Sequence, residues 1–363
     1  MKIGILGGGQ LARMIALAGH ELGFKFVTLD PTEDACASSV SHHLRNNYQD
    51  EKALQQLAQE ADVVTYEFEN VPAKSTKLIE SITPIYPDPL ALTTAQDRMS
   101  EKTLFRELGI NTPDFAPISR LAELKSAVDK LGCPSVLKTR SEGYDGKGQF
   151  VIRDPKDTEK AWQQLKGAPA ILEAFVPFDR EISIIAVRST TGETCFYPIN
   201  ENTHENGILI KTVVRQNDAM QSLAEDYASR LLNHLNYVGV IALELFQAGD
   251  RLLANEYAPR VHNTGHWTQD GAQTSQFENH LRAMLGLPLG STAPINHAAM
   301  LNLIGKPPAV EKVLAFSHAH LHLYDKAPRE GRKIGHINLS CEDKDAFESQ
   351  LTALTKLVKS SNC

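Results

Sequence analysis

Two glutamates are spaced so that they face each other across a predicted β-hairpin. Glu244 and Glu256 lie in two apolar runs that flank the turn signal Ala248-Gly249-Asp250. If the turn is centred on Asp250, the glutamates form a directly opposed pair with Cβ atoms roughly 4.5–5.5 Å apart, where like charges repel. A divalent cation removes this conflict, and Mg²⁺ is commonly held by one or two carboxylates together with substrate phosphates. The pair therefore predicts a site for a nucleotide-bound metal, and two solvated glutamates on an edge hairpin are the alternative.

Cationic and amide donors follow this pair directly. Arg260, His262, Asn263 and His266 stand within ten residues of the second glutamate. Two histidines at i and i+4 can bind zinc when they lie on a helix. The Asn-Thr-Gly sequence between them forms helix poorly, so we expect ordinary polar roles for both histidines.

A glycine-rich loop lies between two predicted strands at residues 143–149. Its sequence, GYDGKGQ, follows the strand Ser135 to Lys138 and precedes the strand Phe150 to Ile152. Glycines leave backbone N–H groups accessible to phosphates, and Lys138 and Lys147 add positive charge. The loop lacks the GxxxxGK[ST] pattern and the following helix of a Walker loop. We therefore expect a hairpin that closes over phosphates, with a plain glycine-rich hairpin as the alternative.

Another glycine cluster stands near the start of the chain. Gly7, Gly9 and Ala12 fit GxGxxA between a strand and a helix, and Asp30 follows at about the spacing of dinucleotide-binding folds. One such match is weak, and it leaves the second glycine loop and the carboxylate hairpin without a role. The helix N-terminus at Gln10-Leu11 is equally suited to a monophosphate or another polar substrate group.

The elements that must position these residues begin with a doubly wound unit. Apolar runs at residues 2–6, 25–29 and 61–66 predict buried strands, and the third ends at the acidic tip Glu67-Phe68-Glu69-Asn70. Alternation of strands and helices is typical of an α/β sheet that binds ligands at the carboxyl ends of its strands. The proline-spaced stretch 83–89 predicts a linker, so we place the first domain at residues 1–90.

The rest of the chain is predicted to form a central domain and a small C-terminal domain. A helix is expected at about 97–108, followed by a small α+β lid at about 113–177. Strands at 181–187, 194–198, 238–246 and 251–257 and a helix at about 222–235 complete a central domain that we bound at 91–293. Residues 294–363 contain alternating segments at 318–324 and 333–339 and a final helix.

Composition excludes several classes of function. The 363 residues carry a net charge of −7, which argues against nucleic-acid or anionic-membrane binding. Five dispersed cysteines without CxxC spacing fit neither a disulfide framework nor a thiolate zinc site. Residues 2–6 read as a strand rather than as part of a signal peptide, and no run approaches about 20 apolar residues. We expect a cytoplasmic protein.

Five segments in order resemble one enzyme family over essentially the whole chain. They are GGGQLARM, TYEFENVP, KTRSEGYDGKGQ, the hairpin running into NEYAPRVHNTGHWTQDGAQTSQFE, and YDKAPREGRKIGHINL. Together they resemble the 5-(carboxyamino)imidazole ribonucleotide synthases, the ATPase subunits of phosphoribosylaminoimidazole carboxylase in bacterial and fungal purine synthesis. The resemblance implies an ATP-grasp fold with an N-terminal Rossmann-like domain, central lid and hairpin domains and a small C-terminal domain.

The resemblance also implies a reaction and its partners. Such ligases use ATP and bicarbonate to carboxylate 5-aminoimidazole ribonucleotide on its exocyclic amine, through carboxyphosphate. Phosphoryl transfer of this kind depends on in-line positioning and charge neutralisation. The implied cofactor is Mg²⁺, or Mn²⁺ in its place, and a homodimer is the expected assembly.

Site residues carry over from the family motif by motif. The implied metal ligands are Glu244 and Glu256, although Ala258 stands where many ATP-grasp proteins have a third, asparagine ligand. The implied catalytic groups are Arg260, as clamp on the carboxyphosphate, with Lys138 and Asp145. ATP would contact Arg98, Lys138, Gly143, Tyr144, Asp145, Gly146, Lys147, Gly148, Gln149, Glu173, Ala174, Phe175, Val176, Glu181, His204, Asn255 and Glu256. The ribonucleotide would contact Gln10, Leu11, Glu67, Tyr144, Asp145, Asn263, Lys326, Arg332 and Lys333.

Three other functions stay open at this point. A related ATP-grasp ligase acting on glycinamide ribonucleotide or a biotin-type substrate would share the metal pair and the lid. A nicotinamide-dependent dehydrogenase is supported by the first glycine cluster and Asp30 alone. A non-catalytic module would bind ATP without bicarbonate-dependent turnover.

Overall fold

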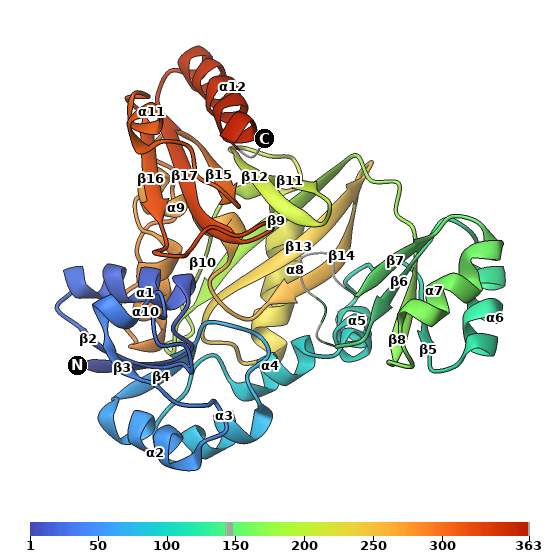
Figure 1. Cartoon of the computed structure of the whole chain (residues 1–363), viewed down its shortest axis with the longest axis horizontal. Helices are drawn as coiled ribbons and strands as arrows, with labels where there is room; N and C mark the ends of the chain where they lie inside the picture. Colours follow the sequence, from blue (N-terminus) through green and yellow to red (C-terminus); the bar gives the residue numbers. More distant parts are fainter. Residues whose placement is uncertain (142, 144–147, 362–363) are drawn as a thin grey trace.

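The computed structural model describes residues 1–141, 143 and 148–361. Within them the strands form three sheets, of four, nine and four strands. Figure 1 shows an N-terminal lobe, a lobe made of β5 to β8 with α6 and α7 that projects away from it, and a third lobe that carries the C-terminal helix. The long strands β9, β13 and β14 run between these lobes.

The N-terminal unit is the predicted parallel sheet with helices on both faces. Its strand order is β3-β2-β1-β4, and all its pairs are parallel. Apolar strand residues are buried together with helix faces on either side, which is the packing that a doubly wound sheet requires. The elements are β1 (Lys2–Leu6), α1 (Gln10–Glu21), β2 (Lys25–Leu29), η1 (Ser38–Val40), β3 (His42–Leu44), α2 (Glu51–Glu60), β4 (Val63–Tyr66) and α3 (Ala73–Glu80).

Two helices connect this unit to the lid. The stretch 83–89, predicted to be a linker, packs along the sheet, where Ile85 forms an isolated parallel bridge with Val64. Helix α4 (Pro89–Ala95) follows, and α5 (Arg98–Glu107) confirms the helix expected at about 97–108. Asp97 caps α5 by accepting hydrogen bonds from the backbone N–H groups of Met99 and Ser100.

The lid is an antiparallel sheet covered by two helices. Its strand order is β5-β8-β6-β7, and its core lies between that sheet and α6 and α7. The elements are β5 (Phe115–Ile118), α6 (Leu121–Leu131), β6 (Ser135–Thr139), β7 (Gln149–Ile152), η2 (Pro155–Asp157), α7 (Thr158–Gln164) and β8 (Ala170–Ala174).

The largest sheet crosses the predicted boundary at residue 294. Its path is β14-β13-β9-β11-β12-β15-β17-β16, with β10 paired to β9. The hairpin β11–β12 and the strand β15 were not predicted, and β15 pairs with β12, which joins the C-terminal segment to the central sheet. The strands are β9 (Arg180–Arg188), β10 (Thr194–Phe196), β11 (Ile199–Glu205), β12 (Ile208–Arg215), β13 (Gly239–Ala248), β14 (Arg251–Ala258), β15 (His297–Ile304), β16 (Ala319–Leu323) and β17 (Lys333–Cys341).

Helices cover both faces of this sheet. On one face α8 packs with α4 and α5 in one core, and on the other α10 packs against α1 of the N-terminal unit in a second core. The helices are α8 (Gln221–His234), η3 (Asn263–Gly265), α9 (Thr268–Gly271), α10 (Gln276–Met284), α11 (Val310–Leu314) and α12 (Lys344–Ser361). The three-domain division at 90 and 293 stays a prediction.

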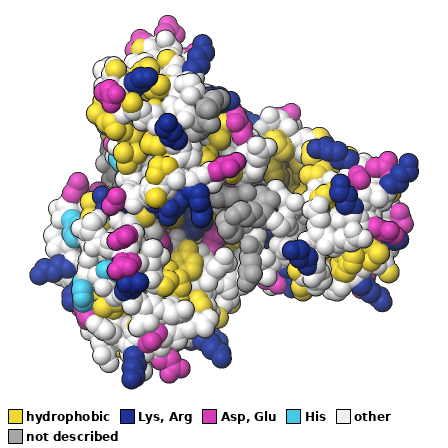
Figure 2. Space-filling view, in the orientation of Figure 1, with side chains coloured by type: hydrophobic (Ala, Val, Ile, Leu, Met, Phe, Trp, Pro, Cys, Tyr) yellow, Lys and Arg dark blue, Asp and Glu magenta, His cyan; other side chains and the backbone are white. Residues whose placement is uncertain are grey.

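The surface carries charges of both signs. On the face shown in Figure 2, Lys and Arg side chains are interspersed with Asp and Glu side chains over all three lobes. Among the helices of the described residues, none combines the length and apolar character needed to cross a membrane.

Candidate active site

A cleft of about 730 Å³ is bounded by residues from the N-terminal unit, the lid and the large sheet, including the start of β17. It brings together most of the residues that the sequence singled out. The predicted residues that line it are Gln10, Leu11, Glu67, Arg98, Lys138, Gly143, Gly148, Gln149, Glu173, Ala174, Phe175, Val176, Glu181, His204, Glu244, Asn255, Glu256, Arg260, Asn263 and Lys333.

Some predicted residues lie elsewhere. Lys326 and Arg332 are not among the described residues that line the cleft. Lys326 reaches its edge, because its Nζ donates a hydrogen bond to the side-chain oxygen of Gln10. Arg332 instead donates to the carbonyl of Ala327 in its own loop at 3.2 Å. Tyr144, Asp145, Gly146 and Lys147 lie outside the described residues.

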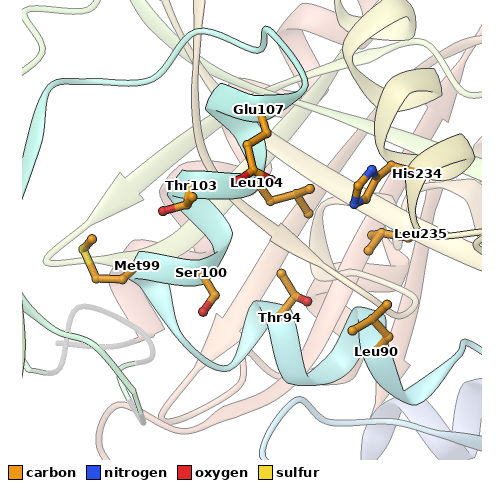
Figure 3. A pocket seen from close by; sticks show the side chains of 9 residues that line it. All are labelled: Leu90, Thr94, Met99, Ser100, Thr103, Leu104, Glu107, His234 and Leu235. Carbon is orange, nitrogen blue, oxygen red and sulfur yellow. The ribbon is translucent and has the colours of Figure 1, made fainter.

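A second hollow, of about 390 Å³, lies between α4, α5 and the end of α8 (Figure 3). It is lined mainly by leucine, threonine and other small or apolar side chains, with Glu107 and His234 at its margin. It brings together no pair of acidic groups and no cluster of cations. The large cleft is therefore the candidate active site.

Glu244 and Glu256 are directly opposed, as predicted, but this depends on a bulge that the sequence did not reveal. Glu244 pairs directly with Glu256, and Ala248 pairs with Arg251, which centres the turn between Gly249 and Asp250 rather than on Asp250. The register shifts between Glu244 and Leu245, so β14 has one extra residue at this point. This bulge restores the opposition that a regular ladder would have lost, since Glu244 would then have faced Asn255.

The bulge also explains why two consecutive residues of one strand line the cleft. In a regular strand neighbouring side chains point to opposite faces. At a bulge two residues of one strand oppose one residue of its partner. Asn255 and Glu256 both border the cleft opposite Glu244. The bulge thus brings these two consecutive residues, both predicted to contact ATP, to the same face of the sheet.

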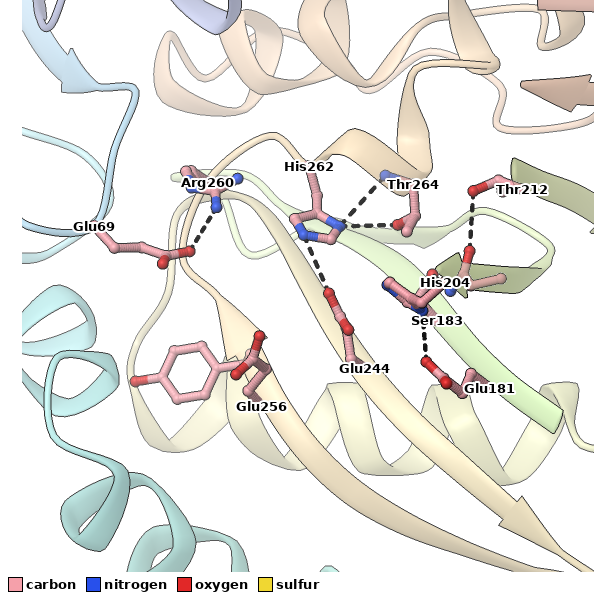
Figure 4. Close-up of polar contacts among 12 residues, drawn as sticks. Glu69, Glu181, Ser183, His204, Thr212, Glu244, Glu256, Arg260, His262 and Thr264 are labelled. Atoms are coloured by element: carbon pink, nitrogen blue, oxygen red, sulfur yellow. Dashed lines mark hydrogen bonds and ion pairs between the residues drawn. The ribbon is translucent and has the colours of Figure 1, made fainter. Parts of the chain in front are cut away.

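The charges of the two glutamates are strongly linked. Burial and the neighbouring Glu256 raise the pKa of Glu244 to about 7. Burial also disfavours ionisation of Glu256, yet the Arg98 guanidinium 2.7 Å from its carboxylate brings the pKa of Glu256 below its usual value. His262 Nε2 lies 3.2 Å from the Glu244 carboxylate (Figure 4).

His262 lies beside Glu244 as a neutral imidazole. The Thr264 backbone N–H donates to His262 Nδ1 at 3.4 Å, which leaves the ring proton on Nε2, facing Glu244. Burial lowers the pKa of His262 well below its usual value. A neutral imidazole cannot supply the charge that two ionised glutamates need.

The residues present fit a divalent cation. Two opposed carboxylates, one with a pKa raised by burial and by the other, are the donor set expected for a cation that completes its coordination with phosphate oxygens and water. Ala258 lies at the cleft without a ligating side chain, whereas both polar atoms of the buried Asn263 amide lack a hydrogen-bond partner. Within the described residues no group of three or more His, Cys, Asp or Glu side chains could hold a metal on its own.

Lys138 joins the lid to the large sheet. Its Nζ donates to Glu173 Oε2 at 3.1 Å and to Asn255 Oδ1 at 3.2 Å. Although Glu173 is buried, Lys138 and the neighbouring Lys102 lower its pKa to about 2. Lys138 is thus held at the base of the cleft, beside the bulge.

Two further pairs line the same cleft. Arg260 Nη2 lies 2.8 Å from the carboxylate of Glu69, which comes from the loop after β4 in the N-terminal unit (Figure 4). His204 Nδ1 lies 2.6 Å from the carboxylate of Glu181. Burial opposes protonation of His204, but this carboxylate raises its pKa above the usual value.

The first glycine cluster does not offer an anion site. The Glu67 carboxylate accepts hydrogen bonds from the N–H groups of Gly9 and Ala12, at 2.9 Å for Ala12, and so caps the N-terminus of α1. Asp30 Oδ2 accepts from the Gly8 N–H at 2.9 Å and the Tyr48 hydroxyl at 2.6 Å. Both acidic groups are therefore engaged where a dinucleotide would need free N–H donors and a free carboxylate.

Several cleft residues were missed by the sequence analysis. The most informative are Glu69, Glu101, Arg140 and, just behind the cleft wall, Lys102. Glu101 and Lys102 are 1% and 0% exposed, and burial and Glu256 raise the pKa of Glu101 to about 8. A signal was present, because both charged residues stand on the helix stripe that also carries Leu104 and Phe105 and must face a core.

Family models match in the order in which these units occur. Residues 1–96 match the ribonucleotide synthetase preATP-grasp domain, residues 103–277 the ATP-grasp domain, and residues 298–350 the phosphoribosylaminoimidazole carboxylase C-terminal domain. The ATP-grasp fold with an N-terminal α/β unit is thereby confirmed.

Individual relatives are similar to this chain in sequence and structure over nearly their full length. The N5-carboxyaminoimidazole ribonucleotide synthase of Pseudomonas aeruginosa is 52% identical over 99% of this chain and 100% of its own. The crystal structure of the corresponding synthetase from Thermus thermophilus is 50% identical, with a TM-score of 0.94 over 98% of each chain. That of Aspergillus clavatus, in complex with ADP and 5-aminoimidazole ribonucleotide, is 31% identical, with a TM-score of 0.93 over 99% of this chain and 98% of its own. This chain belongs to the N5-carboxyaminoimidazole ribonucleotide synthase family of ATP-grasp ligases.

Proposed function

We propose that this chain uses ATP and bicarbonate to carboxylate the exocyclic amine of 5-aminoimidazole ribonucleotide in purine biosynthesis. The observation that carries the proposal is the Glu244–Glu256 pair, opposed in a cleft that also contains Lys138, Arg260 and the capped N-terminus of α1. Family membership supports the same reaction.

The nucleotide half of the cleft lies between the lid and the hairpin. Glu244 and Glu256 would hold Mg²⁺ or Mn²⁺, which when bound neutralises charge on the nucleotide phosphates. Lys138 adds a fixed positive charge from the lid side, beside Glu173 and Asn255. The strand end Glu173 to Val176 and the Glu181–His204 pair line the remainder of this half.

Arg260 is the group best placed to hold the carboxyl intermediate. In the proposed reaction a bicarbonate oxygen attacks the γ-phosphorus, ADP leaves, and carboxyphosphate forms. The amine nitrogen then bonds to the carboxyl carbon, phosphate leaves with the C–O bond electrons, and the amine gives up a proton. Arg260 lies between the metal pair and the N-terminal unit, within reach of Glu69, where a planar guanidinium can bind a carboxylate or phosphate in two-point fashion.

The ribonucleotide half is bounded by the N-terminal unit and the start of β17. Gln10, Leu11 and Glu67 line it from one side, and Asn263 and Lys333 from the other. The free amide of Asn263 can both donate and accept. Lys326, held against Gln10, and Arg332 would extend the phosphate-binding edge, and Tyr144 and Asp145 complete the proposal from outside the described residues.

The decisive experiment follows ADP release with ATP, bicarbonate and one amine at a time. We expect ADP release to require 5-aminoimidazole ribonucleotide, and glycinamide ribonucleotide or biotin to give none above background. A Glu244→Gln variant, which keeps the shape but removes one ligand charge, should lose this release. ADP formed with glycinamide ribonucleotide alone would assign the cleft to a different ATP-grasp reaction, and ATP binding without turnover would make the protein a binding module.

The same proposal includes a cytoplasmic homodimer. The support for both parts is the resemblance to this family of ligases. Sedimentation of the purified protein at micromolar concentration tests the assembly directly.

A further inference from the structure

Side chains on one face of α5 form hydrogen bonds with the edge strand β14 on both sides of its bulge. Lys102 Nζ donates a hydrogen bond to the Ala254 carbonyl at 3.0 Å. Glu101 Oε1 accepts from the Tyr257 N–H at 2.7 Å. The two contacts bracket Asn255 and Glu256, the consecutive residues that the bulge brings to the cleft.

The Ala254 carbonyl and the Tyr257 N–H have no partner in another described strand. In the described part of the chain β14 is the edge of the nine-stranded sheet, so its outer groups bond to other elements: the Ala254 N–H donates to the Asn111 carbonyl at 2.7 Å, and the Ala254 carbonyl and the Tyr257 N–H contact α5. In a regular strand these outward groups belong to alternate residues. Here Ala254 and Tyr257, three residues apart, both point outward, because the bulge adds one residue between them.

The side chains that make these contacts are buried and paired. Lys102 is fully buried and lies 3.5 Å from the Glu173 carboxylate, and Glu101 is 1% exposed. Placing two polar, ionisable side chains in a core is costly unless each gains strong hydrogen bonds. An apolar helix face would pack against β14 as well, but it would leave the Ala254 carbonyl and the Tyr257 N–H unsatisfied.

We propose that Glu101 and Lys102 are positioning residues that hold the β14 bulge and thereby keep Glu256 opposite Glu244. Arg98, one turn earlier on the same helix face, contacts the Glu256 carboxylate itself, and Phe105, one turn later, packs edge-on against the Tyr257 ring at 6.0 Å between centroids. Helix α5 thus sets the separation and direction of the two carboxylates. This inference deepens the proposed function and rests on its metal site.

The test compares metal binding with backbone protection in four variants. Glu101→Leu removes the acceptor for the Tyr257 N–H, and Glu101→Gln keeps it. Lys102→Met removes the donor to Ala254, and Thr103→Val, on the exposed face of the same helix, is the matched control. Mn²⁺ binding in the presence of ADP is measured by electron paramagnetic resonance, metal-free ADP binding by calorimetry, and deuterium uptake over residues 253–258 by mass spectrometry.

We expect Glu101→Leu to weaken Mn²⁺ binding about tenfold or more, as loss of groups that support metal ligands does. Deuterium uptake over 253–258 should rise in Glu101→Leu and in Lys102→Met. Glu101→Gln should bind Mn²⁺ within about twofold of wild type, because its amide oxygen remains an acceptor. Metal-free ADP binding should be unchanged in both Glu101 variants, which a general loss of structure would not allow.

Equal Mn²⁺ affinity and equal uptake in wild type and Glu101→Leu would overturn the inference, as would a Glu101→Gln variant as weak as Glu101→Leu. If Glu101→Leu does not fold, the Glu101→Gln affinity and the Lys102→Met uptake decide by the same criteria. Failure of the proposed function looks different: wild-type protein would show no ADP-dependent Mn²⁺ binding if the metal site is absent, and normal Mn²⁺ binding without ADP release on 5-aminoimidazole ribonucleotide if the substrate is another amine.

Discussion

At the scale of single residues, the cations of the cleft are matched to carboxylates. Arg98 contacts Glu256, Lys138 contacts Glu173, and Arg260 contacts Glu69. Each pair joins two different elements, and a phosphate or carboxyl ligand has to share the cation with the resident carboxylate. The strength of these pairs therefore bears directly on ligand affinity.

Replacing Glu69 should change affinity for bicarbonate. Glu69→Gln removes the negative charge 2.8 Å from Arg260, so an incoming anion no longer competes with it. We expect the KM for bicarbonate to fall about two- to fivefold, the scale of a partly exposed ion pair. Steady-state ADP release at varied bicarbonate measures it. Glu33→Gln, in the distant pair with Arg45, is the control, and a raised KM in Glu69→Gln would mean that Glu69 positions Arg260 instead.

Lys333 is expected to act on the ribonucleotide alone. Its side chain lines the cleft at the start of β17. Lys333→Ala should raise the KM for 5-aminoimidazole ribonucleotide about tenfold or more, while the KM for ATP stays unchanged. Lys312→Ala, an exposed lysine on α11, serves as the control. An unchanged ribonucleotide KM would remove Lys333 from the site.

At the scale of elements, irregularities place the functional groups. The bulge in β14 puts Asn255 and Glu256 on one face, and the turn from β1 into α1 brings Gly7 and Gly9 against Glu67. Gly7 has φ +105, and a Cβ on either glycine would fall within 2.5 Å of a Glu67 side-chain atom. Glycine is needed here so that a carboxylate can approach the helix end closely. The GxGxxA pattern is the same for this arrangement and for dinucleotide binding, so it cannot tell the two apart.

Gly9→Ala should separate Glu67 from α1. The new Cβ would meet Glu67 Oε1 at 2.5 Å, so the carboxylate must leave the helix N-terminus. We expect a loss of about 1–3 kcal/mol in stability, seen as a lower thermal midpoint, and a higher KM for the ribonucleotide with the KM for ATP unchanged. Gly192→Ala, in an open turn between β9 and β10, should leave both KM values as in wild type. A wild-type ribonucleotide KM in Gly9→Ala would show that Glu67 does not need this position.

At the scale of the whole molecule, buried polar contacts fix the lobes around the cleft. His280 on α10 accepts the Val240 N–H at Nδ1 and contacts the Thr65 hydroxyl through Nε2 at 2.9 Å, which links β13 to β4 of the N-terminal unit. Lys326 contacts Gln10 from the C-terminal segment. The cleft therefore depends on the relative placement of units that the chain order separates widely.

The His280 link predicts a pH dependence of stability. Burial lowers the pKa of His280 to about 4, whereas an unfolded chain binds this proton near pH 6.5. The unfolded state thus gains the proton first, and stability falls as pH drops from about 6.5 to about 4, by up to about 3 kcal/mol from this group. Chemical denaturation at a series of pH values gives the free energy of unfolding as a function of pH. Between about pH 4 and about pH 6.5 this free energy should change less steeply with pH in His280→Gln than in wild type or in His234→Gln, an exposed control. Identical slopes in all three proteins would contradict the assignment.

The sequence alone determined what depends on local pattern. Apolar runs and turn residues predicted the parallel N-terminal sheet, the Glu244–Glu256 hairpin and α5, and five ordered motifs indicated the family and about half of the residues that line the cleft. These features were predictable because strand and helix periods and turn residues act over a few neighbouring positions.

Only the tertiary structure decided what depends on distant pairing. The contacts of α5 with β14 on both sides of the bulge, the strand β15 that joins the C-terminal segment to the large sheet, and the capping of α1 by Glu67 each involve partners far apart in the chain. The roles of Glu101 and Lys102 were likewise hidden, since a charged residue on a buried helix face has meaning only once its backbone partner is known. Register and burial arise from non-local packing, and periodicity does not encode which residue stands opposite which.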